Sequence, residues 1–334
     1  MKYFNLSCLA LLILSGVTSS QSLRWSLQTE SGYYHNQEGL FKRRHNCLQQ
    51  LDANLSLQRQ LSGMQFQLKT RINPINYSLQ TPARSFRTQI TSSLRADIHS
   101  RLSMAGTISA QDFQYQDRDD FIQYRIYHLS QQTVYTHSLR QGLILNLDWF
   151  SRQLNRSQVY SFRIYKTDAI FWFPTLHHSS SAAGFYLENF RLRRLQRDNH
   201  GWRYGPQLSL QYRALFEIKI DYRFLFHSSD ITRRFSYEQW IRLILGRMIH
   251  PRLSLILLLD YSVRNLTVQT QQDLDLLYSP INQENGYFGR LEYDLPLSVP
   301  LAIYIKFGYS KNEVVFYDHT LSGFLGLAGF RLKN

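Results

Sequence analysis

Cysteine, negative charge and long apolar runs are all scarce in this sequence. Two cysteines in 334 residues exclude a disulfide-rich secreted scaffold and a zinc site built from cysteines. Beyond the N-terminus no run of 18 apolar residues occurs, so no transmembrane helix is expected. Phosphate-binding loops, dinucleotide-binding motifs and zinc motifs are also missing from the sequence, and no cofactor is therefore predicted.

Positive charge and aromatic rings are plentiful instead. Lys and Arg number 38 against 24 Asp and Glu, which gives a formal net charge of +14. Aromatic residues make up 14% of the chain and charged residues 19%, whereas disordered segments are rich in charge and poor in aromatic rings. The composition therefore indicates a folded, basic protein of one or two domains.

The first twenty residues have the pattern of a secretory signal peptide. Lys2 supplies a positive start, residues 4–17 are mostly apolar, and residues 18–20 place small side chains before Gln21. The apolar stretch is too short to span a membrane. The sequence therefore predicts a signal peptide over residues 1–20 and a mature domain over residues 21–334. A buried N-terminal helix is the alternative interpretation.

Apolar and polar residues alternate along most of the mature chain. In residues 216–226 the apolar residues occupy every even position, and Glu217, Lys219, Asp221 and Arg223 lie between them. Successive side chains of a strand point to opposite faces, so such a segment has one apolar and one polar face. A helix would spread the same charges around its whole circumference. The alternation therefore predicts strands.

These segments are longer than ordinary strands. Many reach ten residues, whereas a typical strand has about five or six and a tilted membrane-spanning strand about 9–11. Their apolar faces also add up to more area than one sandwich core would bury. We therefore predict an all-β fold, an antiparallel transmembrane β-barrel of about sixteen strands. The predicted strands are residues 22–29, 50–61, 64–73, 85–98, 101–112, 121–130, 138–150, 158–173, 176–194, 206–214, 215–227, 234–245, 251–264, 286–295, 299–310 and 321–332.

The connections between these segments alternate between short and long. Membrane barrels have short turns at one end and longer loops at the other, and sixteen strands place both termini at the short-turn end. Three weaker segments, residues 22–29, 101–112 and 121–130, leave fourteen strands as the alternative. The long connections are predicted at residues 30–49, 74–84, 113–120, 195–205, 265–285 and 311–320.

In this pattern the chain resembles the outer-membrane β-barrel proteins of Gram-negative bacteria. The resemblance covers nearly all of residues 22–334 and includes no signature of a particular family. It implies a location in the outer membrane, contact with outer-membrane lipid and lipopolysaccharide, and insertion by the barrel assembly machinery. Such barrels typically end in an aromatic residue, whereas here Phe330 lies near the end and Asn334 is last. This ending departs from the usual form of the assembly signal.

The polar faces of the predicted strands carry more cations than acids. If these faces line the lumen, the excess positive charge favours small anionic solutes, because a confined passage concentrates ions of opposite charge. As alternatives, the charges form cross-strand pairs that stabilise the wall, or the excess meets acidic lipopolysaccharide. Nucleic acid is not an expected partner of an exported barrel. The residues predicted to line the pore are Lys69, Arg71, Arg87, Arg95, Arg140, Arg163, Arg191, Arg193, Arg213, Lys219, Arg223 and Lys306.

A few charged residues fall on faces that the alternation assigns to lipid. Arg59 lies near a strand end, where its cost is small, whereas Lys166, Asp168 and Glu188 lie within predicted strands. A cation at the bilayer midplane costs about 2–4 kcal/mol. These three residues therefore indicate a bulge or an error of register within residues 158–194.

The function predicted from the sequence is a pore rather than an enzyme. No predicted connection is long enough to fold into the lumen as a constricting loop, so the pore is either wide or filled by residues 32–49 or by side chains. One alternative is an adhesive or structural barrel that binds partners through its external loops. Another is an envelope lipid hydrolase or protease.

Two short patterns bear on the enzyme alternative. His178 and Ser180 are two residues apart, with Glu188 or Asn189 as a third group, and a contact between His and Ser would activate the hydroxyl. Both side chains would share one face of a strand. The second pattern resembles the acidic pairs of outer-membrane proteases and lies in predicted external loops: Asp273, Asp275, Asp318 and His319. Either pattern arises easily by chance.

Overall fold

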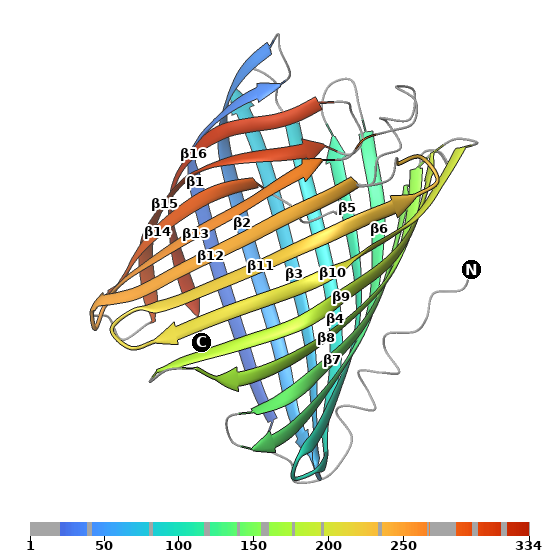
Figure 1. Cartoon of the computed structure of the whole chain (residues 1–334). Helices are drawn as coiled ribbons and strands as arrows, with labels where there is room; N and C mark the ends of the chain where they lie inside the picture. The colour runs from blue at the N-terminus through green and yellow to red at the C-terminus, as the bar shows by residue number, and fades with distance from the viewer. Residues whose placement is uncertain are drawn as a thin grey trace, which may run out of the picture.

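Sixteen strands, each hydrogen-bonded to the next along the chain, form a closed antiparallel β-barrel in a computed structural model of the protein (Figure 1). The structure describes residues 21–38, 42–79, 83–116, 121–138, 141–154, 160–175, 178–194, 197–232, 236–265, 267, 285–295, 300–314 and 319–333. Among these residues, no helix is long and apolar enough to cross a membrane.

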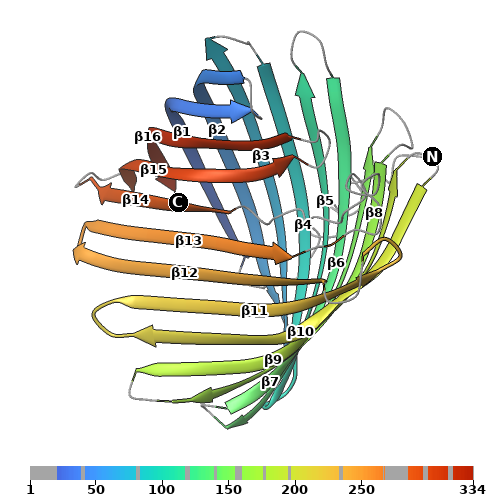
Figure 2. The same ribbon diagram turned by 45° about the horizontal axis from the view of Figure 1, so that its top comes forward.

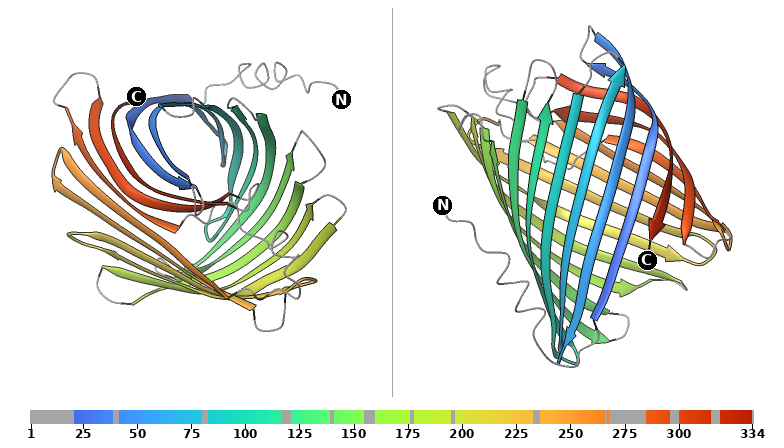
Figure 3. Two further views of the ribbon diagram at one scale, coloured as in Figure 1. Left: turned by 90° about the horizontal axis from the view of Figure 1, so that it is seen from above. Right: turned by 180° about the vertical axis from the view of Figure 1, so that it is seen from behind.

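The strands follow one another around the wall in chain order. β16 pairs with β1 and closes the barrel, with Ser26 opposite Lys333 and Glu38 opposite Leu321. Further views show the same continuous wall, with β16 beside β1 (Figure 2, Figure 3). The strands are β1 (Gln21–Glu38), β2 (Lys42–Leu61), β3 (Met64–Leu79), β4 (Ala83–His99), β5 (Leu102–Gln116), β6 (Phe121–Ser138), β7 (Gln141–Leu154), β8 (Tyr160–Pro174), β9 (Ser179–Arg194), β10 (Arg197–Arg213), β11 (Glu217–Ser229), β12 (Ser236–His250), β13 (Leu253–Asn265), β14 (Asn285–Asp294), β15 (Leu301–Val314) and β16 (His319–Lys333).

The prediction of sixteen strands is confirmed, and fourteen is excluded. Each predicted segment overlaps one strand, in order, including the three weaker segments that correspond to β1, β5 and β6. The predicted lengths of several loops are wrong, because β1 and β2 extend through most of residues 30–49 and β10 begins at Arg197. Main-chain pairing continues beyond the apolar alternation at these ends, since a strand that leaves the lipid no longer needs an apolar face.

The two ends of the barrel differ in their connections. β1 begins and β16 ends at the same end, which we call the termini end; we call the other end the loop end. The termini end includes two-residue turns at residues 62–63 and 100–101. In the first turn Gly63 has a φ of 74°, in the left-handed region that glycine adopts without steric cost.

The outer face of the wall is apolar and exposed. Ile108, Leu208 and Ile305 are 63%, 55% and 57% exposed, although each lies within a paired strand. Such a surface is unstable in water and is typical of contact with lipid. Rings lie toward both ends of this surface, with Trp25 near the termini end and Tyr165 and Trp202 near the loop end. Trp and Tyr favour the headgroup level of a membrane.

The inner face of β8–β12 contains an apolar core of its own. Phe162, Phe190, Leu192 and Leu225 are between 1% and 4% exposed, and they come from three different strands. Side chains therefore fill part of the lumen on this wall, as one of the sequence-based alternatives proposed. Because β8 and β9 carry apolar residues on both faces, their alternation does not distinguish the inner face from the outer one.

This ambiguity made the predicted faces of β8 and β9 wrong. Lys166, Asp168 and Glu188 lie on the inner face, where Lys166 Nζ is 3.4 Å from Asp148 and 3.8 Å from Asp168. The paired strands show no register shift here, so neither a bulge nor a slip is present. The alternate residues of β8 and β9 lie on the outer face, and among them the rings of Tyr165 and Phe185 are exposed.

Candidate pore lining

The predicted pore-lining residues divide between the two faces of the wall. Arg163, Arg191 and Arg193 lie on the outer face, so the prediction that they line the lumen is wrong. Arg140 lies outside the described residues. The inner face holds Lys69, Arg71, Arg87, Arg95, Arg213, Lys219, Arg223 and Lys306.

Arg152, Arg203 and Lys166 are among the inner cations that the sequence did not predict. Arg152 and Arg203 fall in stretches interpreted as loops, and Lys166 was assigned to lipid. Arg152 is buried, with its guanidinium 4.0 Å from the ring centroid of Tyr124 and 5.6 Å from that of Phe162. A sequence signal existed for Arg203, because Trp202 and Tyr204 flank it with the alternation of a strand.

In several ion pairs of the inner face the cation is more exposed than the acid, although Arg95 and Asp97 show the opposite order at 60% and 69%. Arg71 is 42% exposed and its partner Asp52 is 11% exposed, and Arg242 is 36% exposed against 7% for Asp260. Each arginine donates from Nε at 3.0 Å and from a terminal nitrogen. The same order holds for Lys219 over Asp221, Lys166 over Asp148 and Asp168, and Arg290 and Arg331 over Glu292. The carboxylates lie against the strands, and the cations face the interior.

Other inner cations contact neutral groups. Among the residues that the structure describes, no carboxylate lies within ion-pair distance of Lys69, Arg87, Arg223 or Lys306. The guanidinium of Arg223 lies 5.0 Å from the ring centroids of both Tyr186 and Trp240, and its Nε donates to Gln207 at 3.2 Å. These cations add positive charge that no neighbouring acid cancels within the described part of the wall.

A cluster near the apolar core contains charges that are fully buried. Arg203, 2% exposed, donates to Glu188 at 3.0 Å and to Glu238 at 2.9 Å. His227 Nε2 lies 3.2 Å from the second oxygen of Glu238, and Tyr186 donates its hydroxyl hydrogen to Glu188. Burial strengthens such pairs, but the removal of one partner leaves an uncompensated charge. We call these residues the Arg203 cluster.

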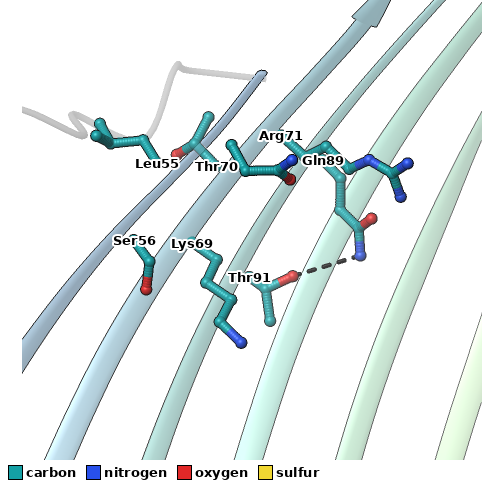
Figure 4. Close-up of a pocket in the computed structure, with 8 residues that line it drawn as sticks. Leu55, Ser56, Lys69, Thr70, Arg71, Gln89 and Thr91 are labelled. Carbon is teal, nitrogen blue, oxygen red and sulfur yellow. Dashed lines mark hydrogen bonds between the residues drawn. The ribbon is translucent and has the colours of Figure 1, made fainter. Parts of the chain in front are cut away.

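A polar hollow lies in the wall of β2, β3 and β4 (Figure 4). Its volume is about 290 Å³. Lys69 lies opposite Thr91 in the strand register, and Gln89 donates to the Thr91 hydroxyl at 3.4 Å. The hollow therefore presents two cations and several hydrogen-bond donors. Its lining is Asn54, Leu55, Ser56, Lys69, Thr70, Arg71, Gln89 and Thr91.

The inner face is open to solvent on more than one wall. Arg95 of β4 is 60% exposed, Arg71 of β3 is 42% exposed, and Lys219 of β11 is 42% exposed. Arg95 and Lys219 lie near the termini end, whereas Arg71 lies near the middle of β3, so the exposure of Arg71 reflects space inside the barrel. The apolar core of β8–β12 therefore fills the lumen only in part.

The residues of the two enzyme patterns do not form a site in the described structure. His178 lies in the turn before β9 with a φ of 63°, so it does not share a strand face with Ser180. Glu188 lies eight residues further along β9, about 26 Å at 3.3 Å per residue, within the Arg203 cluster. Asn189 donates to the carbonyl of Gly201. Asp273, Asp275 and Asp318 lie outside the described residues, and His319 begins β16.

Metal binding is not indicated within the described ranges, where no group of three or more His, Cys, Asp or Glu residues could hold an ion.

Comparison with known proteins identifies the fold. No family model and no curated protein matches the sequence. Among solved structures, CdiB from Acinetobacter baumannii has a TM-score of 0.52 at 9% identity, over 93% of this chain and 60% of CdiB. A BenF-like porin from Pseudomonas fluorescens Pf-5 has a TM-score of 0.49 at 8% identity, over 96% and 100% of the two chains. OccK2 (OpdF) from Pseudomonas aeruginosa has 0.48 at 11%, over 93% and 98%.

At these identities the likeness concerns the fold alone. Together with the closed sixteen-strand wall and its exposed apolar outer face, it confirms the architecture of an outer-membrane β-barrel protein. The predicted location in the outer membrane of a Gram-negative bacterium agrees with this architecture.

Proposed function

We propose that the protein is an outer-membrane pore that favours small anionic solutes. The observation that carries the proposal is the relative exposure of several inner ion pairs. In these pairs the cation is exposed towards the interior and its carboxylate is more deeply buried against the strands. An ion passing along the lumen meets the nearer charge first, so the field is more positive than the number of charges alone implies. The solvent-exposed side chain of Arg71 near the middle of β3 supports an open path.

The polar hollow supplies contacts of the kind that an anion needs. Lys69 could donate charged hydrogen bonds to an anion here, Arg71 adds the guanidinium hydrogens that do not bind Asp52, and Gln89 and Thr91 lie beside them. A weakly held anion can exchange its water for these groups and then leave, which conduction requires.

Reversal potentials in planar bilayers test the proposal. Across a KCl gradient the wild-type protein should favour Cl⁻, and the variant Lys69→Gln/Arg87→Gln/Arg223→Gln/Lys306→Gln should shift the reversal potential towards that of K⁺. These four cations have no carboxylate partner among the described residues, so their removal leaves no acid without its counter-charge. The preference should weaken in concentrated salt, because the screening length falls to about 3 Å at 1 M.

An outer-face variant is the matched control. Arg125→Gln/Arg163→Gln/Arg191→Gln/Arg193→Gln also removes four positive charges, but all four lie outside the lumen. It should leave the reversal potential unchanged. Cation preference in the wild type would contradict the proposal, and so would an equal shift in both variants. A correctly folded protein that opens no channel would favour the adhesive or structural barrel instead.

A further inference from the structure

A cluster of arginines lies on the outer face near the loop end. Arg163 belongs to β8, and Arg191 and Arg193 belong to β9. All three are exposed, Arg191 and Arg193 at 52% and 55%. The conduction proposed above leaves them unused, because they face away from the lumen. We call them the outer arginine cluster.

The strand register brings like charges together in this cluster. Arg163 and Arg191 are directly opposite each other across β8 and β9, and Arg193 lies two residues further along the same face. Directly opposed side chains have their Cβ atoms about 4.5–5.5 Å apart, and like charges at this distance destabilise the pair. A bound anion between them would reverse the sign of that interaction.

The protein compensates this charge only in part. Asp198 of β10 lies 2.6 Å from Arg191 Nη2 and 3.8 Å from Arg193 Nε. The hydrogen bond from Arg191 lowers the pKa of Asp198, so the carboxylate stays ionised. Among the described residues Asp198 is the carboxylate in ion-pair contact with this cluster of three guanidinium groups, and Asp230 lies nearby, where it accepts the backbone N–H of His200. The exposed His200 is the cross-strand neighbour of Arg191 and adds no negative charge.

The neighbouring rows fix the level of the cluster in a membrane. One step towards the middle of the barrel, the outer face carries Trp149, Tyr165, Asn189 and Trp202 side by side across β7–β10. The next step carries Leu147, Thr167, Leu187 and Tyr204. Aromatic rings favour the headgroup level, so the arginines lie at or just beyond the headgroups. They lie at the loop end, opposite the termini, and hence on the external side.

We infer that the outer arginine cluster binds the phosphate groups of a phosphorylated glycolipid in the outer leaflet. Guanidinium groups bind phosphate oxygens through paired, charge-assisted hydrogen bonds. The acyl chains of such a lipid would lie against the apolar face below, over Tyr165, Leu187 and Phe185. The inference rests on the proposed membrane placement but not on conduction, and lipid binding is measured separately from channel activity.

Native mass spectrometry of the detergent-solubilised protein tests the inference. The wild-type protein should retain bis-phosphorylated lipid A and lose dephosphorylated lipid A of the same acyl composition. The variant Arg163→Gln/Arg191→Gln/Arg193→Gln should retain the phosphorylated lipid at least tenfold less. The inner variant Lys69→Gln/Arg87→Gln/Lys306→Gln loses the same charge and should match the wild type. Excess inorganic phosphate should not displace the lipid, because it lacks the apolar contacts.

Two further variants keep the test decisive if the glutamine variant assembles poorly. Asp198→Asn removes the competing carboxylate and should increase retention, an effect that a purely structural role would not produce. Arg163→Lys/Arg191→Lys/Arg193→Lys keeps the charge without the paired donors and should retain an intermediate amount. Equal retention of the two lipids by the wild type would overturn the inference. Full displacement by inorganic phosphate would also overturn it, because it would show an anion site without lipid selectivity.

Discussion

Replacing Arg203 by Met should lower the free energy of unfolding by about 3–5 kcal/mol, the cost of breaking a buried ion pair. Arg203 is 2% exposed, and its two partners Glu188 and Glu238 are 4% and 0% exposed. Methionine fills a similar volume but offers neither carboxylate a donor, so two charges remain in a low-dielectric space. Urea-induced unfolding in lipid vesicles, followed by tryptophan fluorescence, measures the difference.

Arg213→Met is the matched control on the same strand and face. Arg213 lies 3.1 Å from Glu217, but these side chains are 69% and 55% exposed. Water screens this pair, so its loss should cost less than about 1 kcal/mol. Similar losses for the two variants would show that the Arg203 cluster is not buried in the folded barrel.

A triple variant distinguishes the loss of the ion-pair attraction from the cost of leaving two buried carboxylates without a cation. Arg203→Met/Glu188→Gln/Glu238→Gln removes the cation and both carboxylates together. Because a neutral, well-packed replacement of a buried ion pair is often no less stable than the pair, most of the lost stability should return. A triple variant as unstable as Arg203→Met would assign the cost to packing instead.

The sequence predicted the architecture because strand alternation depends on local order alone. Residues 216–224 alternate without exception, and β11 begins at Glu217 with the predicted faces. The limits of β1 and β10 were not predictable in the same way. Residues 30–38 and 197–201 are mostly polar and carry no apolar periodicity, yet their main chains continue to pair with neighbouring strands.

The residues assigned to the wrong face of the wall share one physical origin. Phe162, Ile164, Phe190 and Leu192 are as apolar as lipid-facing residues, but they pack inside the barrel. Alternation shows that two faces differ without showing which one meets lipid. The sequence therefore predicted Lys166, Asp168 and Glu188 on the lipid face and Arg163, Arg191 and Arg193 in the lumen, the reverse of their places in the structure. Only the positions of the neighbouring strands resolve the choice.

The sequence could also not predict that several inner cations are more exposed than the acids they pair with. Arg71 and Asp52 are 19 residues apart, and Arg242 and Asp260 are 18 apart. Their contact depends on the register between strands. An excess of lumenal cations was predictable from the polar faces, but the burial of the acids beneath those cations was not.

Replacing Ile90 by Arg should block stable assembly of the barrel, with a cost of about 2–4 kcal/mol for a cation at the bilayer midplane. Ile90 lies near the middle of β4 on the outer face, is 39% exposed, and has Thr70 and Ala110 as its cross-strand neighbours. None of these groups offers the guanidinium a counter-charge, and lipid offers it no water.

Ser93→Arg places the same side chain on the opposite face of the same strand. Its cross-strand neighbours are Gln67 and Thr107, both polar, and the lumen supplies water, so this variant should assemble normally. The fraction of protein that is recovered in outer membranes and migrates differently on gels before and after heating measures assembly. Normal assembly of both variants would show that Ile90 does not meet lipid. Failure of both would show that the inner wall near Ser93 is packed rather than open. The expected difference arises only if this wall separates lipid from water as its two faces indicate.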